Sequence, residues 1–500
     1  MVSICLDAGT TTIKAVAFDD NGTELLVARE ATKVSRPKPG HSEQDMNEVW
    51  DAVVHTIRTA HRELGGEDVG MIAFTGQGDG CWLVDRQGNP TGPAMLWNDA
   101  RAAAIADEWE RSGVSQQAFR INGSLSFAGL PNAILTWLQR HDPERLERSH
   151  KALKGDGWIF YKLTGVMADD VSDMSVPLLD IRKREFSPEL LRLYGIEWAE
   201  RLLPDVLQDD QRVGRLSEEA AAQLGLPAGL PVVIASYDIA ATAVGVGAVA
   251  AGQSCSILGT TLCTEVVVDH INTDVEPSGF TIAFGVPGHE LRAYPTLAGT
   301  EVVSWTLKLL GLTEPRQLSD LAAKVAPGAF GLSFMPYLSP AGERAPFLNS
   351  SARGSLMGLS FEHDREHVAR AVLEGLTLVI KDCLAATDTI PTQLGVCGGG
   401  ANSEFWVQMI ADVTGVPTFR SADTEVGAKG AFITGLVTTG AEPDFAQAAS
   451  KYVKVRDTLE PDERAAGAYA EVFQDFLELR GTAGQAWPRL AAARERAAAG

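Results

Sequence analysis

Basic residues are scarce in this sequence relative to acidic ones. It contains 43 Lys and Arg against 65 Asp and Glu, which gives a net charge of −22. A nucleic-acid backbone attracts proteins with a basic surface, so this charge argues against a DNA or RNA partner. It also means that any phosphate site must depend on local donors and a metal ion rather than on the overall field.

The sequence also lacks the cysteine spacing of a metal or redox site, and it lacks long apolar runs. No Cys-x-x-Cys occurs among the six cysteines, so we expect reduced thiols in the core rather than disulfides or a metal site. No apolar stretch reaches the roughly 18 residues of a membrane span. Only three residues precede the first predicted strand. These absences predict a cytoplasmic protein without a signal peptide or a membrane anchor.

Length and hydrophobic content predict two large domains. Five hundred residues exceed one ordinary core, and a hydrophobic fraction of 45% argues against disorder. We place the domains at residues 1–244 and 245–445 and expect a helical extension over 446–500.

Two β-rich runs flank a turn of small and hydroxyl residues within Ile4–Phe18. The turn, Gly9–Thr12, can direct backbone N–H groups and hydroxyls toward one point, which suits a phosphate. Asp7 ends the first run and could hold Mg²⁺ through water, because this ion keeps much of its hydration shell. The alternative is a buried hairpin with an incidental Asp, since a short glycine motif is weak without its context.

A second copy of this pattern lies in the middle of the chain. Gly259–Thr261 begins 250 residues after the start of Gly9–Thr11, and an apolar β run again follows it. Ile257 stands where Asp7 stands in the first copy. Two similar domains would each present a phosphate-facing turn across a cleft, which is a preferred place for a small-molecule site. Both turns would then bind the phosphates, and only the first would serve the metal.

Polar residues cluster after two further predicted strands, at the strand ends where α/β sheets bind their ligands. The first strand is followed by Gln77 and Asp79, and the second by Asn98, Asp99 and Arg101. A carboxylate, an amide and a guanidinium can together pair with several hydroxyls of a polyol or a sugar. The alternative is that the two aspartates only cap turns or helices.

Further carboxylates lie at a strand-to-helix junction and in an acidic segment. Asp238 follows the short strand Pro231–Ala235 and could accept the proton of an attacking hydroxyl, a role that contributes roughly 10²–10⁴-fold. The alternative for Asp238 is an ordinary helix N-cap. Ala168–Pro177 is predicted as a polar loop that either lines the cleft or caps the segment after it.

Three glycines separate the predicted strand Gln393–Cys397 from the predicted helix Glu404–Thr414. The loop between them, Gly398–Asn402, lets a flat ring lie against the backbone, and a helix N-terminus favours anionic groups. The alternative for these glycines is packing alone. A further helix over Thr424–Thr434 carries glycines and alanines that permit close approach to a neighbour.

These motifs together resemble those of the FGGY carbohydrate kinases of the actin-like ATPase superfamily, from about Ile4 to about Thr439. The most specific stretch, Gly354–Glu374, fits a signature pattern of that family throughout its length. Supporting similarities lie at Asp7–Thr11, Trp97–Arg101, Gly259–Thr261, Gly342–Pro346 and Gly398–Asn402. One departure is plain: another family signature has a lysine three residues before a tryptophan, and here Ile134 stands at that spacing before Trp137.

The resemblance implies an α/β fold of two duplicated actin- or ribonuclease-H-like domains that flank a catalytic cleft. It implies transfer of a phosphate from ATP, with Mg²⁺, to a hydroxyl of a small polyol or sugar. It implies that Asp238 is the catalytic base and that Asp7 lies near the metal and ATP. The residues predicted to bind substrate are Gln77, Gly78, Asp79, Asn98, Asp99, Arg101 and Asp238. Those predicted to bind ATP are Gly9, Thr10, Thr11, Lys14, Gly259, Thr260, Thr261, Gly399, Gly400 and Asn402.

The residues after Gln77 bear on the substrate. Xylulose kinases typically show Met-His there and glycerol kinases Arg-Glu, whereas Thr75–Gly80 with its Gly78-Asp79 looks most like erythritol kinases. Asp79 keeps a hydroxyl acceptor while Gly78 opens space, so we expect a four-carbon polyol, with erythritol converted to erythritol 4-phosphate. Other polyols and the ketopentoses xylulose and ribulose remain alternatives, because one CHOH group is a small difference for a pocket to detect.

Functions of other classes are less consistent with the sequence. A non-catalytic sugar sensor on the same fold would not need the base, yet Asp238 is present. An actin-like filament or a chaperone ATPase would not need the polar cluster at 77–101. Dimerisation is common in the family that the chain resembles, and nothing in this sequence shows it.

Overall fold

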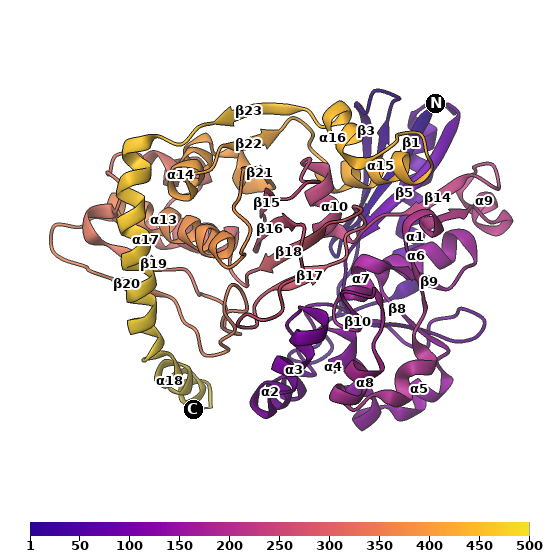
Figure 1. Cartoon of the computed structure of the whole chain (residues 1–500), viewed down its shortest axis with the longest axis horizontal. Coiled ribbons are helices and arrows are strands. Elements are labelled where there is room, and N and C mark those ends of the chain that lie inside the picture. Colours follow the sequence, from indigo (N-terminus) through magenta and orange to yellow (C-terminus); the bar gives the residue numbers. More distant parts are fainter. Residues whose placement is uncertain (500) are drawn as a thin grey trace. The chain divides into compact units, whose positions relative to one another are not determined.

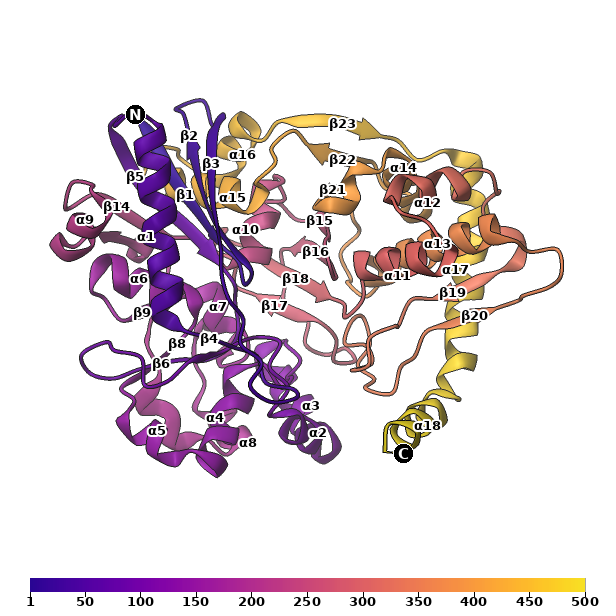
Figure 2. The same ribbon diagram turned by 180° about the vertical axis from the view of Figure 1, so that it is seen from behind.

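The computed structural model describes residues 1–499, so Gly500, at the end of the predicted C-terminal extension, lies outside the described residues. Internal contacts divide the chain into two units (Figures 1 and 2). The first unit contains Met1–Ala250, Val268–Leu291 and Asp423–Val453; the second contains Ala251–Val267, Arg292–Ala422 and the chain from Lys454 onward. The division into 1–244, 245–445 and 446–500 stays a prediction.

The first unit is built on a central sheet of mixed strand direction. The strands of the whole unit, six of which form this sheet, are β1 (Val2–Ala8), β2 (Thr12–Phe18), β3 (Glu24–Ala31), β4 (Glu43–Gln44), β5 (Val69–Gly76), β6 (Trp82–Val84), β7 (Ala94–Met95), β8 (Lys151–Leu153), β9 (Ala168–Asp170), β10 (Leu179–Asp180), β11 (Glu185–Phe186), β12 (Asp205–Leu207), β13 (Val213–Arg215), β14 (Pro231–Ile234) and β17 (Phe280–Ile282). The central order is β13-β14-β5-β1-β2-β3, with β1, β5 and β14 parallel and the remaining pairs antiparallel. The carboxyl ends of the three parallel neighbours therefore meet at one edge of the sheet.

Helices cover both faces of this sheet. The helices of this unit are α1 (Met46–Glu63), α2 (Ala103–Ser112), α3 (Val114–Asn122), α4 (Pro131–His141), α5 (Pro143–Arg148), α6 (Gly155–Thr164), α7 (Val171–Ser175), α8 (Pro188–Tyr194), α9 (Glu218–Leu224), α10 (Asp238–Gly245), α15 (Val426–Thr438) and α16 (Phe445–Tyr452). Asp45 caps α1 through the N–H groups of Asn47 and Glu48, and α1 buries Val49, Trp50, Val53 and Ile57 toward the core. Figure 2 shows α1 in front of the sheet, and Figure 1, from the opposite side, shows α15 there. Strands covered on both faces are apolar almost throughout, as β1 and β2 are.

The second unit repeats the central part of this topology. Its strands are β15 (Gln253–Leu258), β16 (Leu262–Val268), β18 (Glu290–Pro295), β19 (Ser333–Met335), β20 (Ser355–Met357), β21 (Gln393–Cys397), β22 (Thr418–Ser421) and β23 (Val455–Leu459), and its helices are α11 (Thr300–Leu310), α12 (Pro315–Ala322), α13 (Arg365–Ala385), α14 (Glu404–Thr414), α17 (Glu463–Gly484) and α18 (Trp487–Ala499). The run β16-β15-β21-β22 has the same order and directions as β2-β1-β5-β14, with one antiparallel hairpin followed by two parallel pairings. The duplicated α/β architecture predicted from the sequence is confirmed.

Two smaller predictions concern the cysteines and the membrane. All six cysteines are free and buried, which confirms the expectation of reduced core thiols. Over residues 1–499, no helix combines the length and the apolar composition that crossing a bilayer requires.

Candidate active site

Asp7 and Lys14 face each other where the first hairpin closes. Asp7 lies opposite Lys14 in the β1–β2 register, and the Lys14 ammonium lies 3.5 Å from its carboxylate. The same ammonium lies 2.8 Å from Glu425, just before α15, which Arg29 also binds at 2.5 Å. Burial raises the pKa of Asp7, and Glu425 raises it further against the opposing effect of Lys14. This end of the sheet is therefore a place where a divalent cation would relieve unfavourable negative charge.

The residues present fit such a cation only in part. Among residues 1–499 no group of three or more His, Cys, Asp or Glu side chains is placed to hold a metal. Mg²⁺ often takes one or two carboxylates and completes its shell with water and substrate phosphates. Asp7, with a side chain that is 20% exposed, suits that mode of binding.

The turn after β1 is held by hydrogen bonds to three side chains, those of Gln77, Trp97 and Gln44. The Thr10 hydroxyl donates to Gln77 Oε1 at 2.7 Å and accepts from Trp97 Nε1 at 3.0 Å. Gln77 Nε2 donates to Gln44 Oε1 at 2.7 Å, and Gln44 Nε2 donates to the Thr10 carbonyl at 2.8 Å. Gln77 is 5% exposed. Its amide thus fixes the turn that the sequence predicts for phosphate binding.

Asp99 and Arg101 form a closed ion pair. Arg101 Nε and Nη2 bind the two Asp99 oxygens at 2.8 Å each, and Nη2 also reaches Glu43 at 2.6 Å. The Ser42 N–H donates to Asp99 Oδ2 at 2.7 Å. The side chains of Asp99 and Arg101 are 0% and 4% exposed, whereas Asn98 is exposed. Asp99 does not cap a helix, because α2 begins only at Ala103, after an N-cap residue without a side-chain bond. It does cap a turn, since Asp99 Oδ1 accepts from the Arg101 N–H at 2.9 Å.

Asp79 adopts a left-handed backbone conformation, with φ 59°, between Gly78 and Gly80. Aspartate tolerates this region better than most residues because its short polar side chain bonds locally. The Asp79 N–H donates to Asp173 Oδ1 at 3.0 Å, and the Lys154 ammonium lies 3.8 Å from Asp79 and 2.8 Å from Asp173. Burial alone lowers the pKa of Lys154, but Asp173 and Asp79 outweigh it, and the net shift is upward.

The segment 168–177 is not the loop that the sequence predicts. It forms β9 and α7, and Asp169, Asp170 and Asp173 are fully buried. Asp170 pairs with Arg212 at 2.8 Å, and Asp169 accepts from the Lys154 N–H at 2.7 Å. The prediction was wrong because carboxylates normally lie in water, whereas here two distant cations and backbone N–H groups stabilise them inside the fold.

Asp238 is the first residue of α10, as the sequence predicts, at the end of β14. Its carboxylate accepts from the Ile239 N–H at 2.8 Å. Burial raises the pKa of Asp238 to about 8, and the nearby charges of Asp7 and Asp173 add to the effect. The N-cap interpretation is wrong, because Tyr237 occupies that position.

Close packing of two helices fixes where Asp238 lies. A Cβ at Gly430 of α15 would lie 2.6 Å from the Ala241 carbonyl carbon of α10, and one at Gly245 would lie 2.9 Å from Val426. Real Cβ atoms do not come this close, so both positions require glycine. The small residues of α15 thus allow α10 to pack closely against it, which confirms the close approach predicted for Thr424–Thr434.

The second unit carries the other two predicted ATP-binding loops. Gly259–Thr261 joins β15 to β16, and its Gly259 and Thr260 carbonyls accept from the first N–H groups of α11 at 2.9 and 3.3 Å. After β21, Gly400 is packed against Trp406 and Leu258, and Gly398 has φ 84°. Packing therefore explains these two glycines.

Gly399 differs from its neighbours. A Cβ at Gly399 would have no atom within 4 Å, so its surface is open. Asn402 Nδ2 donates to the Gly399 carbonyl at 3.2 Å and closes the loop. This part of the loop is free to accept a flat ring.

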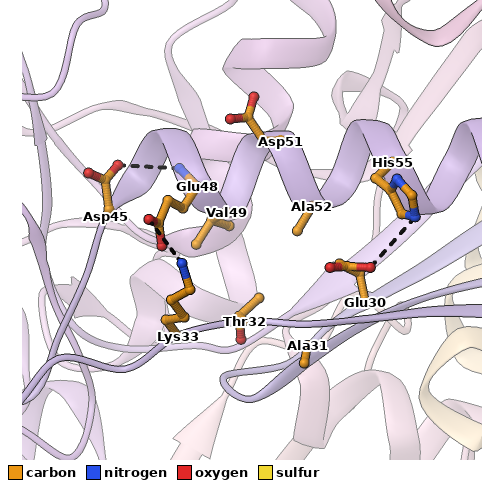
Figure 3. A pocket seen from close by; sticks show the side chains of 10 residues that line it. All are labelled: Glu30, Ala31, Thr32, Lys33, Asp45, Glu48, Val49, Asp51, Ala52 and His55. Atoms are coloured by element: carbon orange, nitrogen blue, oxygen red, sulfur yellow. Dashed lines mark hydrogen bonds and ion pairs between the residues drawn. The ribbon is translucent and has the colours of Figure 1, made fainter.

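Figure 3 shows a surface pocket of about 380 Å³ in the first unit, between β3 and α1. Lys33 pairs with Glu48 at 3.5 Å, and His55 lies 3.6 Å from Glu30. None of the predicted site residues lines this pocket.

Sequence reasoning missed Lys154, Asp173, Arg212 and Glu425. Each is a charged residue that is nearly inaccessible to solvent, and each pairs with a partner from another element. No local spacing marks such pairs.

Comparisons with known proteins agree with this architecture. The N-terminal domain of the FGGY family of carbohydrate kinases matches residues 2–245, and the C-terminal domain of that family matches residues 255–439. The erythritol kinase of Brucella abortus (strain 2308) is 32% identical over 98% of each chain. The xylulose kinase of Escherichia coli (strain K12) is 32% identical over 82% of this chain and 84% of its own. Among solved structures, a xylulose kinase from Rhodospirillum rubrum superimposes with a TM-score of 0.89 at 26% identity over 97% of this chain and 100% of its own.

Two complete domain matches and relatives that span the chain show an enzyme that transfers phosphate from ATP to a small sugar or polyol. The chain belongs to the FGGY family of carbohydrate kinases.

Proposed function

We propose that this kinase phosphorylates a four-carbon polyol, with erythritol as its substrate and erythritol 4-phosphate as its product. The similarity to the Brucella abortus erythritol kinase extends over 98% of the chain and supports this proposal. The Gly78-Asp79 sequence after Gln77, which looks most like that of erythritol kinases, also supports it. A ketopentose kinase is the second candidate, because the E. coli xylulose kinase is equally identical over its shorter match.

The observation that carries the catalytic proposal is the half-buried carboxylate of Asp238 at the start of α10, whose pKa is raised to about 8. Asp7 lies at the end of β1, Asp79 follows β5 and Asp238 follows β14, and these three strands are parallel neighbours. We assign Asp238 as the general base and Asp79 as an acceptor for a substrate hydroxyl. A base with a pKa near the working pH combines a useful ionised fraction with a useful proton affinity.

Other residues act by binding and positioning. We assign Gly9–Thr11 and Gly259–Thr261 to the phosphates of ATP, and Gly399 with Asn402 to the adenosine. Asp7 would hold Mg²⁺ through water, and the bound ion would neutralise phosphate charge. Lys14, which the sequence predicts to bind ATP, has its ammonium 3.5 Å from Asp7 and 2.8 Å from Glu425, and we assign it to the same phosphate site. Asn98 is exposed and is assigned to a substrate hydroxyl. Gln77, Asp99 and Arg101, which the sequence also predicts to bind substrate, have polar atoms bonded to other side chains, and we assign them to positioning.

The reaction then follows from positioning. Asp238 takes the proton of one polyol hydroxyl, the oxygen attacks the γ-phosphorus, and the bond from that phosphorus to the bridging oxygen of ADP breaks. Attacking and leaving oxygens must lie in line, so the contribution of the protein is geometry and charge stabilisation.

A substrate panel tests the proposal. ADP release is measured with Mg²⁺ and ATP against erythritol, threitol, ribitol, xylitol, glycerol, xylulose and ribulose, and kcat/KM values are compared. We expect erythritol to lead by about tenfold or more, the discrimination that one additional carbon group gives in a shaped pocket. A lead for xylulose or ribulose would establish the second candidate, and the absence of polyol turnover would contradict the proposal.

A further inference from the structure

A tyrosine ring lies directly against Gly78. A Cβ on Gly78 would lie 2.8 Å from Cε2 and 2.9 Å from Cγ of Tyr237. Carbon atoms in contact are normally separated by about 3.5–4.0 Å, so no other residue fits at position 78 while this ring is in place. Tyr237 is 3% exposed, which means that the ring is packed rather than mobile in solvent.

This contact corrects one part of the sequence analysis. Gly78 was expected to open space for the substrate, but the space beside its Cα is filled by the Tyr237 ring. Glycine at this position is therefore half of a size-matched pair. A large side chain at 78 requires a small residue at 237, and the reverse also holds.

Each member of the pair directly precedes a carboxylate in the chain. Gly78 directly precedes Asp79, and Tyr237 directly precedes Asp238. The ring thus joins the backbone next to the proposed hydroxyl acceptor to the backbone next to the proposed base. A larger side chain at position 78 would therefore have to displace the Tyr237 ring or one of the two backbones.

Both segments are also held by one short helix, α7. The Tyr237 N–H donates to Ser172 Oγ at 3.1 Å, and the Asp79 N–H donates to Asp173 Oδ1 at 3.0 Å. Ser172 and Asp173 are both fully buried. Two adjacent residues of a buried helix therefore hold the two backbones, and the Tyr237 ring sets the gap between them.

We propose that the Gly78–Tyr237 contact sets the spacing between Asp79 and Asp238 and so selects the length of the acceptor. Tyr237 is a specificity-determining positioning residue, and the acceptor class that it favours is a four-carbon polyol over five-carbon sugars and polyols. The proposal rests on the proposed function, because it takes Asp79 and Asp238 as the groups that bind the two ends of the reacting segment. Xylulose kinases, which typically carry Met at the position of Gly78, would need a smaller residue at 237.

The test exchanges the large and the small side chain between positions 237 and 78. Tyr237→Gly, Gly78→Met and the double variant are compared with the wild type for kcat/KM with erythritol, xylitol and xylulose, for the KM of ATP and for thermal stability. We expect Tyr237→Gly to lower the preference for erythritol over the five-carbon acceptors by about tenfold, within the range that one carbon group gives. Gly78→Met alone should lose stability because of the overlap, and the double variant should recover it with a five-carbon preference.

A second glycine–tyrosine contact in the same unit gives a matched control. A Cβ on Gly88 would overlap the ring of Tyr161, whose hydroxyl donates to the Gln87 carbonyl at 3.0 Å. Tyr161→Gly removes a ring that α6 places against the turn at Gly88, and it should leave the substrate preference unchanged. A shift in this control as large as that of Tyr237→Gly would overturn the inference.

The remaining outcomes separate the inference from the function on which it rests. If the wild type prefers erythritol, and Tyr237→Gly keeps both that preference and the ATP KM, the inference is wrong and the proposed substrate stands. If the wild type itself prefers a five-carbon acceptor, the proposed substrate is wrong, and the inference fails with it.

Discussion

Replacing Asp238 by Asn is the most direct test of the catalytic assignment. The change keeps the size of the side chain and removes its ability to accept a proton. Asp238 begins α10, which glycine contacts with α15 hold in place, so the backbone has no reason to move. We expect kcat to fall by about 10²–10⁴, the usual contribution of a general base, with the KM values of ATP and polyol little changed.

The pKa of Asp238 adds a pH signature. With a pKa of about 8, roughly a tenth of this carboxylate is ionised at pH 7 and most of it at pH 9. The wild-type kcat/KM for the polyol should therefore rise by up to about tenfold between these pH values, because only the ionised form accepts the proton. The Asp238→Asn variant should not show this rise in kcat/KM.

As pH rises, the free energy of unfolding should fall while the activity increases. The pKa of Asp238 is raised from 3.8 to about 8 on folding, so its contribution to stability is lost as pH rises through this window. At pH 7 the cost of keeping the carboxyl protonated in the fold is about 4 kcal/mol at most, at about 1.4 kcal/mol per pH unit. Asn carries no such cost, so the variant should unfold at a higher urea concentration at pH 7 than the wild type.

The assay is steady-state kinetics from pH 6.5 to 9.5 together with urea unfolding at pH 5 and pH 7. Asp51→Asn is a matched control, since Asp51 is exposed on α1 and should change neither measurement. An Asp238→Asn enzyme that keeps the wild-type kcat, or that keeps the alkaline rise, refutes the assignment of the base.

Three further predictions concern other charged residues. Asp79→Asn keeps a side chain that tolerates φ 59° and removes the charge, so the polyol KM should rise about tenfold while the ATP KM stays constant; an effect on ATP alone would contradict the placement. Glu425→Gln removes one of the two carboxylates that hold the Lys14 ammonium and leaves it closer to Asp7, so more Mg²⁺ should be needed for half-maximal rate; an unchanged Mg²⁺ titration would count against the pairing. Burial raises the pKa of Asp156 well above its ordinary range, and neither of its oxygens has a hydrogen-bond partner. Stability should therefore fall less steeply from pH 5 to pH 8 in Asp156→Asn than in the wild type, and equal slopes in urea unfolding would show that Asp156 does not titrate there.

The two hairpins with glycine turns could be predicted from the sequence alone, because each is a local pattern. The apolar runs around Gly9–Thr11 and Gly259–Thr261 form β1–β2 and β15–β16, and their repeat at half the chain length predicted the duplication. The position of Asp238 at the start of a helix was predictable for the same reason. Strand ends, turns and helix starts depend on neighbouring residues, so a linear reading finds them.

The surroundings of those residues could not be predicted in this way. Asp79 and Asp173 are 94 residues apart in the chain and share Lys154, and Lys14 and Glu425 come from opposite ends of the first unit's sequence. The acidic composition of segment 168–177 predicted a solvated loop, whereas in the fold Arg212 and Lys154 lie beside its buried carboxylates. Likewise, the missing side chain of Gly78 indicated open space beside its Cα, but the fold places the Tyr237 ring there.

The family, the duplicated sheet and the places along the chain where chemistry can occur could thus be predicted from local patterns. Three features depend on the fold: which charges neutralise one another, which carboxylate has a pKa near 8, and which glycine lies against a ring. Hydrogen-bonded turns and strands arise from contacts between near neighbours. The pKa of a buried group and the room beside a glycine depend instead on atoms that only folding brings together.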